Sequence, residues 1–117
     1  MPLVRIVTNQ FTQDTETKTA LLAEVSESAS RLLKKPERWV MTCLEPGAAM
    51  TFAGTEEPAC YIEVKNIGKF TPELTSLLSS EISSLVSKHL GIDKARTYVE
   101  FSDAVGYLWG YDGSTFG

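Results

Sequence analysis

The chain has 117 residues, 43% of them hydrophobic and 22% charged, and its 11 basic and 15 acidic side chains give a net charge of −4 at pH 7. These values are typical of one globular domain, here residues 1–117, with a real hydrophobic core. They argue against nucleic-acid binding, because the sequence has no basic cluster to neutralise phosphates. No apolar run reaches the ~18 residues of a membrane span, and no signal-peptide pattern opens the chain, so we expect a cytoplasmic protein without a membrane partner.

Proline stands at position 2, directly after the initiator methionine, and a strand-forming run follows it at 3–9. A small second residue allows removal of Met1, which leaves Pro2 with a free secondary amine. A terminal amine titrates near pH ~8, and burial or a nearby cation lowers that pKa toward neutrality, where a general base is most effective. The strand would hold the amine in place. Pro2 is therefore a candidate base, although a proline here, taken alone, implies only methionine removal.

The first helix is predicted from about residue 15 to residue 33, where apolar side chains recur at helical spacing. Asp14 or Thr15 can cap its start. Pro36 should end it, because the residue before a proline avoids the helical region of backbone space. A second strand is expected at 39–44.

A turn at 45–47 follows, and residues 50–52 are expected to extend the sheet briefly. The second half repeats the order of the first. Residues 60–67 alternate apolar and polar side chains, as a half-buried strand does. Thr71 can cap a second helix that Gly91 ends, and residues 97–101 read as the next strand.

The predicted order is strand–helix–strand, repeated in two halves at about 1–57 and 58–117. Helices that cover one face of a sheet, with no third layer, give an α/β (α+β) two-layer sandwich with two helices on a four-stranded mixed sheet. Each helix should connect two parallel strands. The other face of the sheet has nothing in this chain to cover it, so we expect it to pack against other subunits.

Cysteine and histidine carry no catalytic pattern in this sequence. Cys43 and Cys60 lack CxxC spacing and a histidine at metal-ligand spacing, which favours buried, reduced thiols. His89 falls near the end of the second helix, where a cation complements the helix dipole. We therefore expect no metal site.

Several segments together resemble the family of macrophage migration inhibitory factor and D-dopachrome tautomerase, in the tautomerase superfamily. They lie in order and at the family's spacing over the whole chain, namely Met1-Pro2, Lys35-Pro36, Pro46, Met50-Thr51-Phe52-Ala53-Gly54, Glu57-Pro58, Asn66-Ile67-Gly68-Lys69, Arg96-Thr97-Tyr98 and Ser114-Thr115-Phe116. The resemblance implies a homotrimer with active sites at the subunit interfaces. It also implies a cofactor-free keto–enol tautomerase acting on phenylpyruvate-like 2-oxo acids, and it leaves non-classical secretion open.

Site roles follow from the same resemblance, position by position. Pro2 matches the catalytic base, Lys35 the cation that holds a substrate carboxylate, and the Ile67 backbone N–H a donor to substrate oxygen, with Asn66 beside it where relatives often have serine. Tyr98 matches a tyrosine supplied by the neighbouring subunit. The pocket walls correspond to Trp39, Trp109, Tyr111 and Phe116. This set suits a planar aryl-pyruvate, which needs a cation, a flat apolar slot and a base near its β-carbon.

The sequence departs from the family pattern at two places. Glu100 stands where relatives have asparagine, and a carboxylate near Pro2 would raise the pKa of the amine and oppose Lys35. The CxxC of the vertebrate cytokine is replaced by Ala59 and Ile62, which argues against thiol oxidoreductase activity. Two other functions stay open at this point, a cytokine or binding protein with a vestigial pocket and a purely structural trimer. Retention of Met1 would leave Pro2 an amide without basicity.

Overall fold

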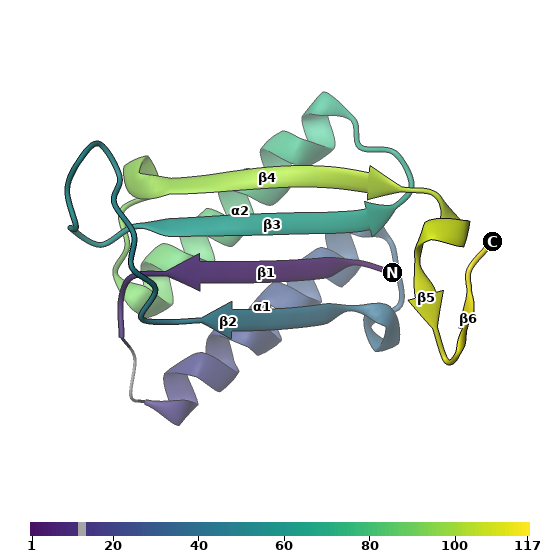
Figure 1. Cartoon of the computed structure of the whole chain (residues 1–117), viewed down its shortest axis with the longest axis horizontal. Helices are drawn as coiled ribbons and strands as arrows, with labels where there is room; N and C mark the ends of the chain where they lie inside the picture. The colour runs from purple at the N-terminus through teal and green to yellow at the C-terminus, as the bar shows by residue number, and fades with distance from the viewer. Residues whose placement is uncertain (12–13) are drawn as a thin grey trace.

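The computed structural model describes residues 1–11 and 14–117. Figure 1 shows one four-stranded sheet with both long helices on the same face. The helices are α1 (Thr15–Leu33) and α2 (Pro72–Leu90), and the strands of the sheet are β1 (Leu3–Thr8), β2 (Met41–Glu45), β3 (Cys60–Ile67) and β4 (Thr97–Ala104). The expected two-layer fold, with two helices on a four-stranded mixed sheet, is confirmed.

The sheet has the strand order β2-β1-β3-β4. β1 and β2 run parallel and are joined through α1, while β3 and β4 run parallel and are joined through α2. The central pair, β1 and β3, is antiparallel, with Leu3 opposite Lys65 and Thr8 opposite Cys60. Each parallel pair with its helix is thus one β-α-β unit. The N-terminus of β1 lies at the end of the sheet where β3 and β4 finish (Figure 1).

Both helices begin with the cap that their sequence predicts. The Asp14 carboxylate accepts a hydrogen bond from the Glu16 N–H at 3.0 Å, and the Thr71 hydroxyl accepts one from the Leu74 N–H at 3.2 Å. These side chains satisfy backbone donors that lack a partner in the first turn of a helix. Pro72 suits the first position of α2 because its ring has no N–H to leave unpaired.

The core lies between the helices and the sheet. Side chains alternate along β1 and β3, so that Val4, Ile6, Ile62 and Val64 face the helices and are completely buried. The helices add further buried apolar residues from their inner faces, namely Leu21, Val25, Ala29, Leu78, Ile82 and Val86. Because strands of period two and helices of period 3.6 bury one face each, this core fixes which side chains of β1 and β3 point away from the helices.

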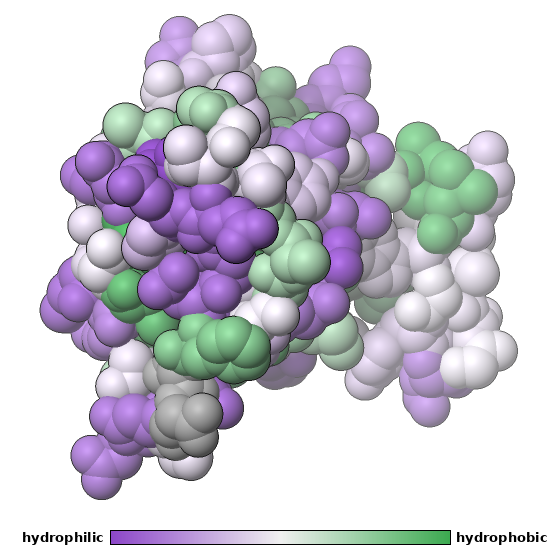
Figure 2. All heavy atoms as spheres, turned by 60° about the vertical axis from the view of Figure 1, so that its left-hand side comes forward, coloured by the Kyte–Doolittle hydropathy of each residue, from purple (hydrophilic) through white to green (hydrophobic). Residues whose placement is uncertain are grey.

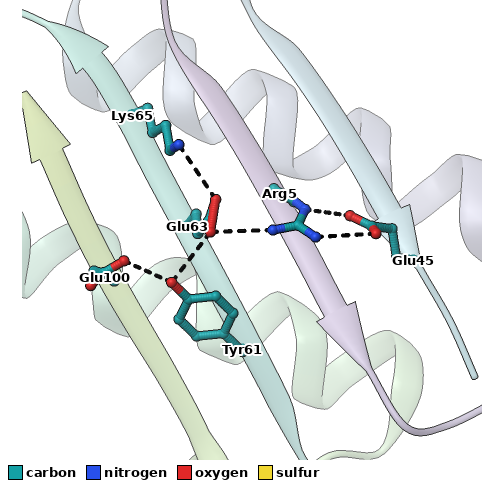
Figure 3. A network of polar contacts seen from close by, with 6 residues as sticks. All are labelled: Arg5, Glu45, Tyr61, Glu63, Lys65 and Glu100. Atoms are coloured by element: carbon teal, nitrogen blue, oxygen red, sulfur yellow. Dashed lines mark hydrogen bonds and ion pairs between the residues drawn. The ribbon is translucent and has the colours of Figure 1, made fainter. Parts of the chain in front are cut away.

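The opposite face of the sheet, which none of the described helices covers, carries ion pairs at its centre. Arg5 of β1 lies between Glu45 of β2 and Glu63 of β3, as Figure 3 shows. Its guanidinium donates to Glu45 and, at 3.2 Å, to Glu63. The hydrogen bond from Arg5 lowers the pKa of the Glu45 carboxyl below its ordinary value. The face that we expect to pack against other subunits thus carries charges in its middle.

The C-terminal tail folds into a small hairpin beside the N-terminal end of β1 (Figure 1). It contains β5 (Gly110–Tyr111) and β6 (Ser114–Thr115), which follow a short 3-10 turn at Gly106–Leu108. The Phe116 N–H donates to the Gly106 carbonyl at 3.2 Å, and a Cβ at Gly106 would meet the Phe116 carbonyl oxygen at 2.8 Å. Glycine at 106 thus allows the close approach that anchors the tail.

Figure 2 turns the opposite end of the molecule toward the viewer. That surface is largely hydrophilic, while the C-terminal tail projects behind it as a lobe with an apolar patch. The tail and the strand end before it expose large apolar side chains, namely Val105, Tyr107, Leu108 and Tyr111. Exposed apolar residues gathered at one end of a small domain are typical of a contact surface.

Three of the expected boundaries are wrong in detail. Trp39 belongs to a 3-10 turn at Glu37–Trp39, so the second strand starts only at Met41. Residues 50–52 do not extend the sheet, because Phe52 pairs only with Thr55 in an isolated bridge. β4 runs on to Ala104, three residues beyond its predicted end.

The two cysteines and the histidine lie in the predicted elements. Cys60 is buried, and burial raises the pKa of its thiol to about 12. Cys43 is only half-buried, which differs from the expectation of a buried thiol, and both thiols are free. His89 lies in the last turn of α2, where its Nε2 is 3.0 Å from the Glu24 carboxylate of α1.

Candidate active site

A pocket of about 280 Å³ opens at the edge of the sheet where the chain begins. Met1 and Pro2 form part of its lining, together with the turn that precedes β2 and the hairpin of the C-terminal tail. Four of the nine predicted site residues other than Pro2 also line it, namely Trp39, Trp109, Tyr111 and Phe116. The pocket therefore joins segments from both ends of the sequence.

Three aromatic rings pack against one another in the pocket wall. The Trp39 ring meets Tyr111 edge-on at a centroid distance of 4.9 Å and Phe116 at 5.7 Å. Tyr111 and Phe116 stack at 5.5 Å with an interplanar angle of 15°. Contacts of this geometry stabilise aromatic clusters beyond the area that they bury. The wall is thus a packed aromatic cluster, in which Trp39 stands edge-on to two stacked rings, and its apolar surface suits an aromatic ligand.

Pro2 directly precedes β1 and is held against the sheet. Its side chain is fully buried, and its carbonyl accepts a hydrogen bond from the Met41 N–H at 2.9 Å. In this chain the terminal amine belongs to Met1, and partial burial, followed by the nearby Lys35 cation, lowers the pKa of that amine. An amine at this edge of the sheet is therefore shifted toward the neutral, basic form.

Lys35 reaches this region from the end of α1. Its backbone is fixed by two hydrogen bonds to Ser30, one from the Lys35 N–H to the Ser30 carbonyl at 3.1 Å and one from the Ser30 hydroxyl to the Lys35 carbonyl at 2.6 Å. Its Nζ donates to the Ile67 carbonyl at 3.1 Å. The structure thus brings Lys35 and Ile67 together beside Pro2, although neither lines the pocket itself.

Asn66 lies one residue before the end of β3, on the helix-facing side of the sheet. It is only 4% exposed. Its Oδ1 is a buried acceptor without a hydrogen-bond partner among the described residues 1–11 and 14–117. Native proteins leave few buried polar atoms unpaired.

Tyr98 and Glu100 do not reach the pocket of their own chain. Tyr98 is in register with Tyr61 and Val7, which is five residues along β1 from Pro2, or about 17 Å at the rise of a strand. Tyr98 is 67% exposed, so its ring is available to a neighbouring molecule.

The Glu100 carboxylate accepts a hydrogen bond from the Tyr61 hydroxyl at 2.7 Å on the uncovered face of the sheet (Figure 3). That hydrogen bond, with smaller contributions from burial and from the charges of Glu63 and Glu100, raises the pKa of Tyr61 to about 12. Within one chain, Glu100 is therefore a partner of Tyr61.

The sequence analysis missed Arg38, which lines the pocket. Its guanidinium carbon lies 5.4 Å from the centroid of the Trp39 ring, a cation–π arrangement. Its position between Pro36 and an aromatic residue was a weak sequence signal, because the resemblance drew attention to Lys35 alone. The pocket thus has a basic side chain in its own wall as well as Lys35 nearby.

Comparison with known proteins gives a consistent result over the whole chain. The family model described as "Macrophage migration inhibitory factor (MIF)" matches residues 1–117. A macrophage migration inhibitory factor homolog from Brugia malayi is 32% identical over 117 residues, which is 100% of both chains. The crystal structure of a homologue from Prochlorococcus marinus is 40% identical, with a TM-score of 0.92, and the match covers 98% of this chain and 99% of that one.

A third relative supports the same grouping at lower identity. The structure of the macrophage migration inhibitory factor from Trichinella spiralis is 25% identical, with a TM-score of 0.87, over 97% of this chain and 99% of that chain. The matches thus give the class as the small α+β sandwich of these structures. The chain belongs to the macrophage migration inhibitory factor family.

Membrane insertion finds no support in the helices. Among the described residues, none of the helices combines the length and the apolar character that crossing a bilayer requires.

Proposed function

We propose that this protein is a cofactor-free keto–enol tautomerase that acts on phenylpyruvate-like 2-oxo acids, with Pro2 as general base once Met1 has been removed. The observation that carries the proposal is the pocket itself, which Pro2 lines together with an aromatic cluster and a basic side chain. The family membership supports it, since the family model matches residues 1–117.

The reaction needs one base and a site for a negatively charged intermediate. The neutral Pro2 nitrogen takes a proton from the β-carbon of the keto acid, so that the C–H bond breaks and an N–H bond forms. The electron pair moves into a new carbon–carbon double bond, and the carbonyl becomes an enolate. Proton return to that oxygen gives the enol, while return to carbon regenerates the keto form. The base is most effective when its pKa lies near the working pH.

Cations at the pocket fit the charge of such a substrate. Lys35 beside Pro2 and Arg38 in the wall suit the carboxylate of a 2-oxo acid and the developing enolate oxygen. The aromatic wall of Trp39, Tyr111 and Phe116 suits the phenyl ring. Together these contacts would hold the β-carbon near the amine, and such positioning contributes strongly to rate.

The test of the base compares protein that has lost Met1 with protein that retains it. We expect tautomerisation of phenylpyruvate, followed by ultraviolet absorbance, only in the processed form. Pro2→Gly should lose most of the rate, at least ~100-fold, because a general base contributes about 10²–10⁴-fold. Circular dichroism should show an unchanged fold. Full activity in protein shown by mass spectrometry to retain Met1 throughout would exclude the terminal amine as the base.

Assembly is the second part of the proposal. A homotrimer would cover the apolar side chains at the tail and would bring Tyr98 and Glu100 of one chain toward the pocket of the next. The exposed ring of Tyr98, far from its own Pro2, supports this arrangement. Sedimentation at micromolar concentration should give the mass of three chains. A stable monomer with full activity would contradict the shared site.

A further inference from the structure

The unpaired oxygen of Asn66 distinguishes it from other buried polar side chains of the molecule. The hydroxyl of Thr8 donates to the Ala59 carbonyl at 2.8 Å, and that of Ser83 donates to the Ser79 carbonyl at 2.5 Å. Asn66 is as deeply buried, yet its Oδ1 has no partner among residues 1–11 and 14–117. A buried acceptor without a donor costs free energy, so an atom of this kind calls for a physical reason.

The strand register identifies the neighbour of Asn66. β1 and β3 pair from Leu3 opposite Lys65 to Thr8 opposite Cys60, and if this register is extended by one residue beyond β1, Pro2 comes opposite Asn66. Both side chains are buried and continue the helix-facing sets of their strands, Pro2 with Val4 and Asn66 with Val64. Residues directly opposite in an antiparallel pair have Cβ atoms only ~4.5–5.5 Å apart. The extended register and the shared burial therefore put Asn66 and the proline ring on the same face at the same end of the sheet.

The state of the Pro2 nitrogen decides whether a donor is present there. While Met1 is attached, this nitrogen belongs to a tertiary amide and carries no hydrogen. Removal of Met1 converts it into a secondary amine with one N–H when neutral and two when protonated. Processing thus creates a donor at the residue opposite Asn66.

We propose that Asn66 is a positioning residue for the processed N-terminus, with its Oδ1 accepting a hydrogen bond from the Pro2 N–H. A neutral secondary amine has one N–H and one lone pair. Anchoring the N–H on Asn66 leaves the lone pair free to point into the pocket. This role rests on the proposed function in one respect, because it takes the lone pair of Pro2 as the catalytic base. The hydrogen bond itself would form whether or not the protein is an enzyme.

Charged groups around the amine set the background for its titration. Lys35 approaches from the end of α1, and Arg38 lies in the pocket wall before β2. Asp103 of β4 is in register with Asn66 and is exposed. In the proposed trimer the neighbouring chain would add Glu100. Acceptance by Asn66 favours the protonated amine and so acts against the two cations, which favour the neutral form.

The decisive experiment compares Asn66→Leu in the two forms of the protein. An inhibitor of methionine aminopeptidase during expression gives chains that retain Met1, and mass spectrometry verifies both forms. With Met1 attached, the substitution replaces an unpaired acceptor by an apolar group of similar shape, so the urea midpoint of unfolding should stay the same or rise. In the processed form the same substitution removes a hydrogen bond, so the midpoint should fall.

Asn9 provides the matched control, because it is the other asparagine of the chain. Its side chain is fully engaged, since Nδ2 donates to the Glu57 carbonyl at 3.0 Å and Oδ1 accepts from the Ala59 N–H at 3.0 Å. Asn9→Leu should therefore lower the midpoint by the same amount in both forms. Equal shifts for Asn66→Leu in both forms would overturn the proposal and would indicate a partner that does not depend on processing, such as a buried water.

A measurement on the unmutated protein covers the case in which Asn66→Leu does not fold. In processed protein, the ¹³Cγ resonance of Asn66 should titrate together with the Pro2 amine, while that of Asn9 should stay flat. Asn66→Leu, where it folds, should lower the pKa of the amine by ~0.5–1 unit, the value of one hydrogen bond. A resonance of Asn66 that ignores the Pro2 titration contradicts the hydrogen bond. Phenylpyruvate turnover, assayed separately on unmutated protein, tests the proposed function independently.

Discussion

The two β-α-β units end their helices with the same backbone device but use the next residue differently. Both helices have 19 residues and close on a residue in the left-handed region, Lys34 with φ of 55° after α1 and Gly91 with φ of 69° after α2. Each capping N–H donates to a serine carbonyl one turn earlier, Ser30 or Ser87.

The residue after each cap decides the difference. In the second unit it is Ile92, which is completely buried in the core. In the first unit it is Lys35, half-buried, with its Nζ on the Ile67 carbonyl beside the pocket. One fold position thus serves packing in one unit and presents a cation in the other. The comparison indicates which substitutions should affect stability and which should affect binding.

Ile92→Ala and Lys35→Met should separate these two roles most strongly. Loss of a fully buried isoleucine side chain costs ~2–5 kcal/mol of unfolding free energy. Lys35→Met keeps the aliphatic stem and should cost less than ~1 kcal/mol, while kcat/KM for phenylpyruvate falls ~10–100-fold with the loss of a charge-assisted contact. Urea unfolding measures the stability of both variants, and steady-state kinetics measures their kcat/KM for phenylpyruvate. Similar stability losses in both variants would mean that Lys35 is mainly structural.

Substitutions at the two C-terminal helix caps should change the free energy of unfolding by about 1 kcal/mol. A Cβ at Gly91 meets no atom within 4 Å, so Gly91→Ala should destabilise the fold by ~1 kcal/mol through its left-handed backbone alone. Lys34→Gly relieves the same strain in the first unit and should stabilise by a smaller amount, because glycine also gains freedom in the unfolded chain. Thermal unfolding of both variants tests whether the caps are equivalent. A stabilising Gly91→Ala would contradict this account.

The smallest expected change in stability concerns Glu24, which connects the helices of the two β-α-β units. Its carboxylate on α1 contacts His89 at 3.0 Å and Lys88 at 3.1 Å in the last turn of α2. Hydrogen bonds from His89 and then Lys88 lower the pKa of Glu24. A carboxyl with a lowered folded-state pKa stabilises the fold above its ordinary pKa and loses that contribution as pH falls through the lowered value.

Glu24→Gln tests this contact through the pH dependence of unfolding. The variant should be slightly less stable than the original chain at pH 7, and the difference should disappear in acid, below the folded-state pKa of Glu24. Urea midpoints measured between pH 7 and pH 2 supply the comparison. Glu27→Gln on the same helix is a control without a shared partner on the last turn of α2. A difference that grows as pH falls would contradict the assigned sign.

Patterns local in the sequence predicted most of the fold. Helical spacing and the caps at Asp14 and Thr71 located both helices, and alternation located the central strands. The sequence analysis placed Trp39 in a strand because tryptophan favours β structure. Pro36 instead begins a 3-10 turn that includes Trp39. The β propensity of a single residue is weaker than the tertiary context, which here requires the chain to turn before β2 begins.

The site was predictable only as far as the family motifs reach. Those motifs indicated Pro2, and the structure places that residue against the aromatic wall. Arg38 and the unpaired oxygen of Asn66 depend on strand register and on how the tail folds back, which no local pattern reports. The environment of Glu100 could not be predicted from a local pattern either, because its hydrogen bond with Tyr61 depends on the pairing of β3 with β4.

The unequal burial of the two cysteines makes the protein a convenient subject for thiol labelling. Alkylating reagents attack the thiolate, and the raised pKa and burial of Cys60 leave almost none of it at neutral pH. Cys43 is half-buried on the uncovered face of the sheet, in register with Arg5. A single folded chain should therefore take up one maleimide and a denatured chain two, while packing of other subunits against this face should slow the labelling of Cys43. A fluorophore on Cys43 would then report directly on whatever comes to lie against that face.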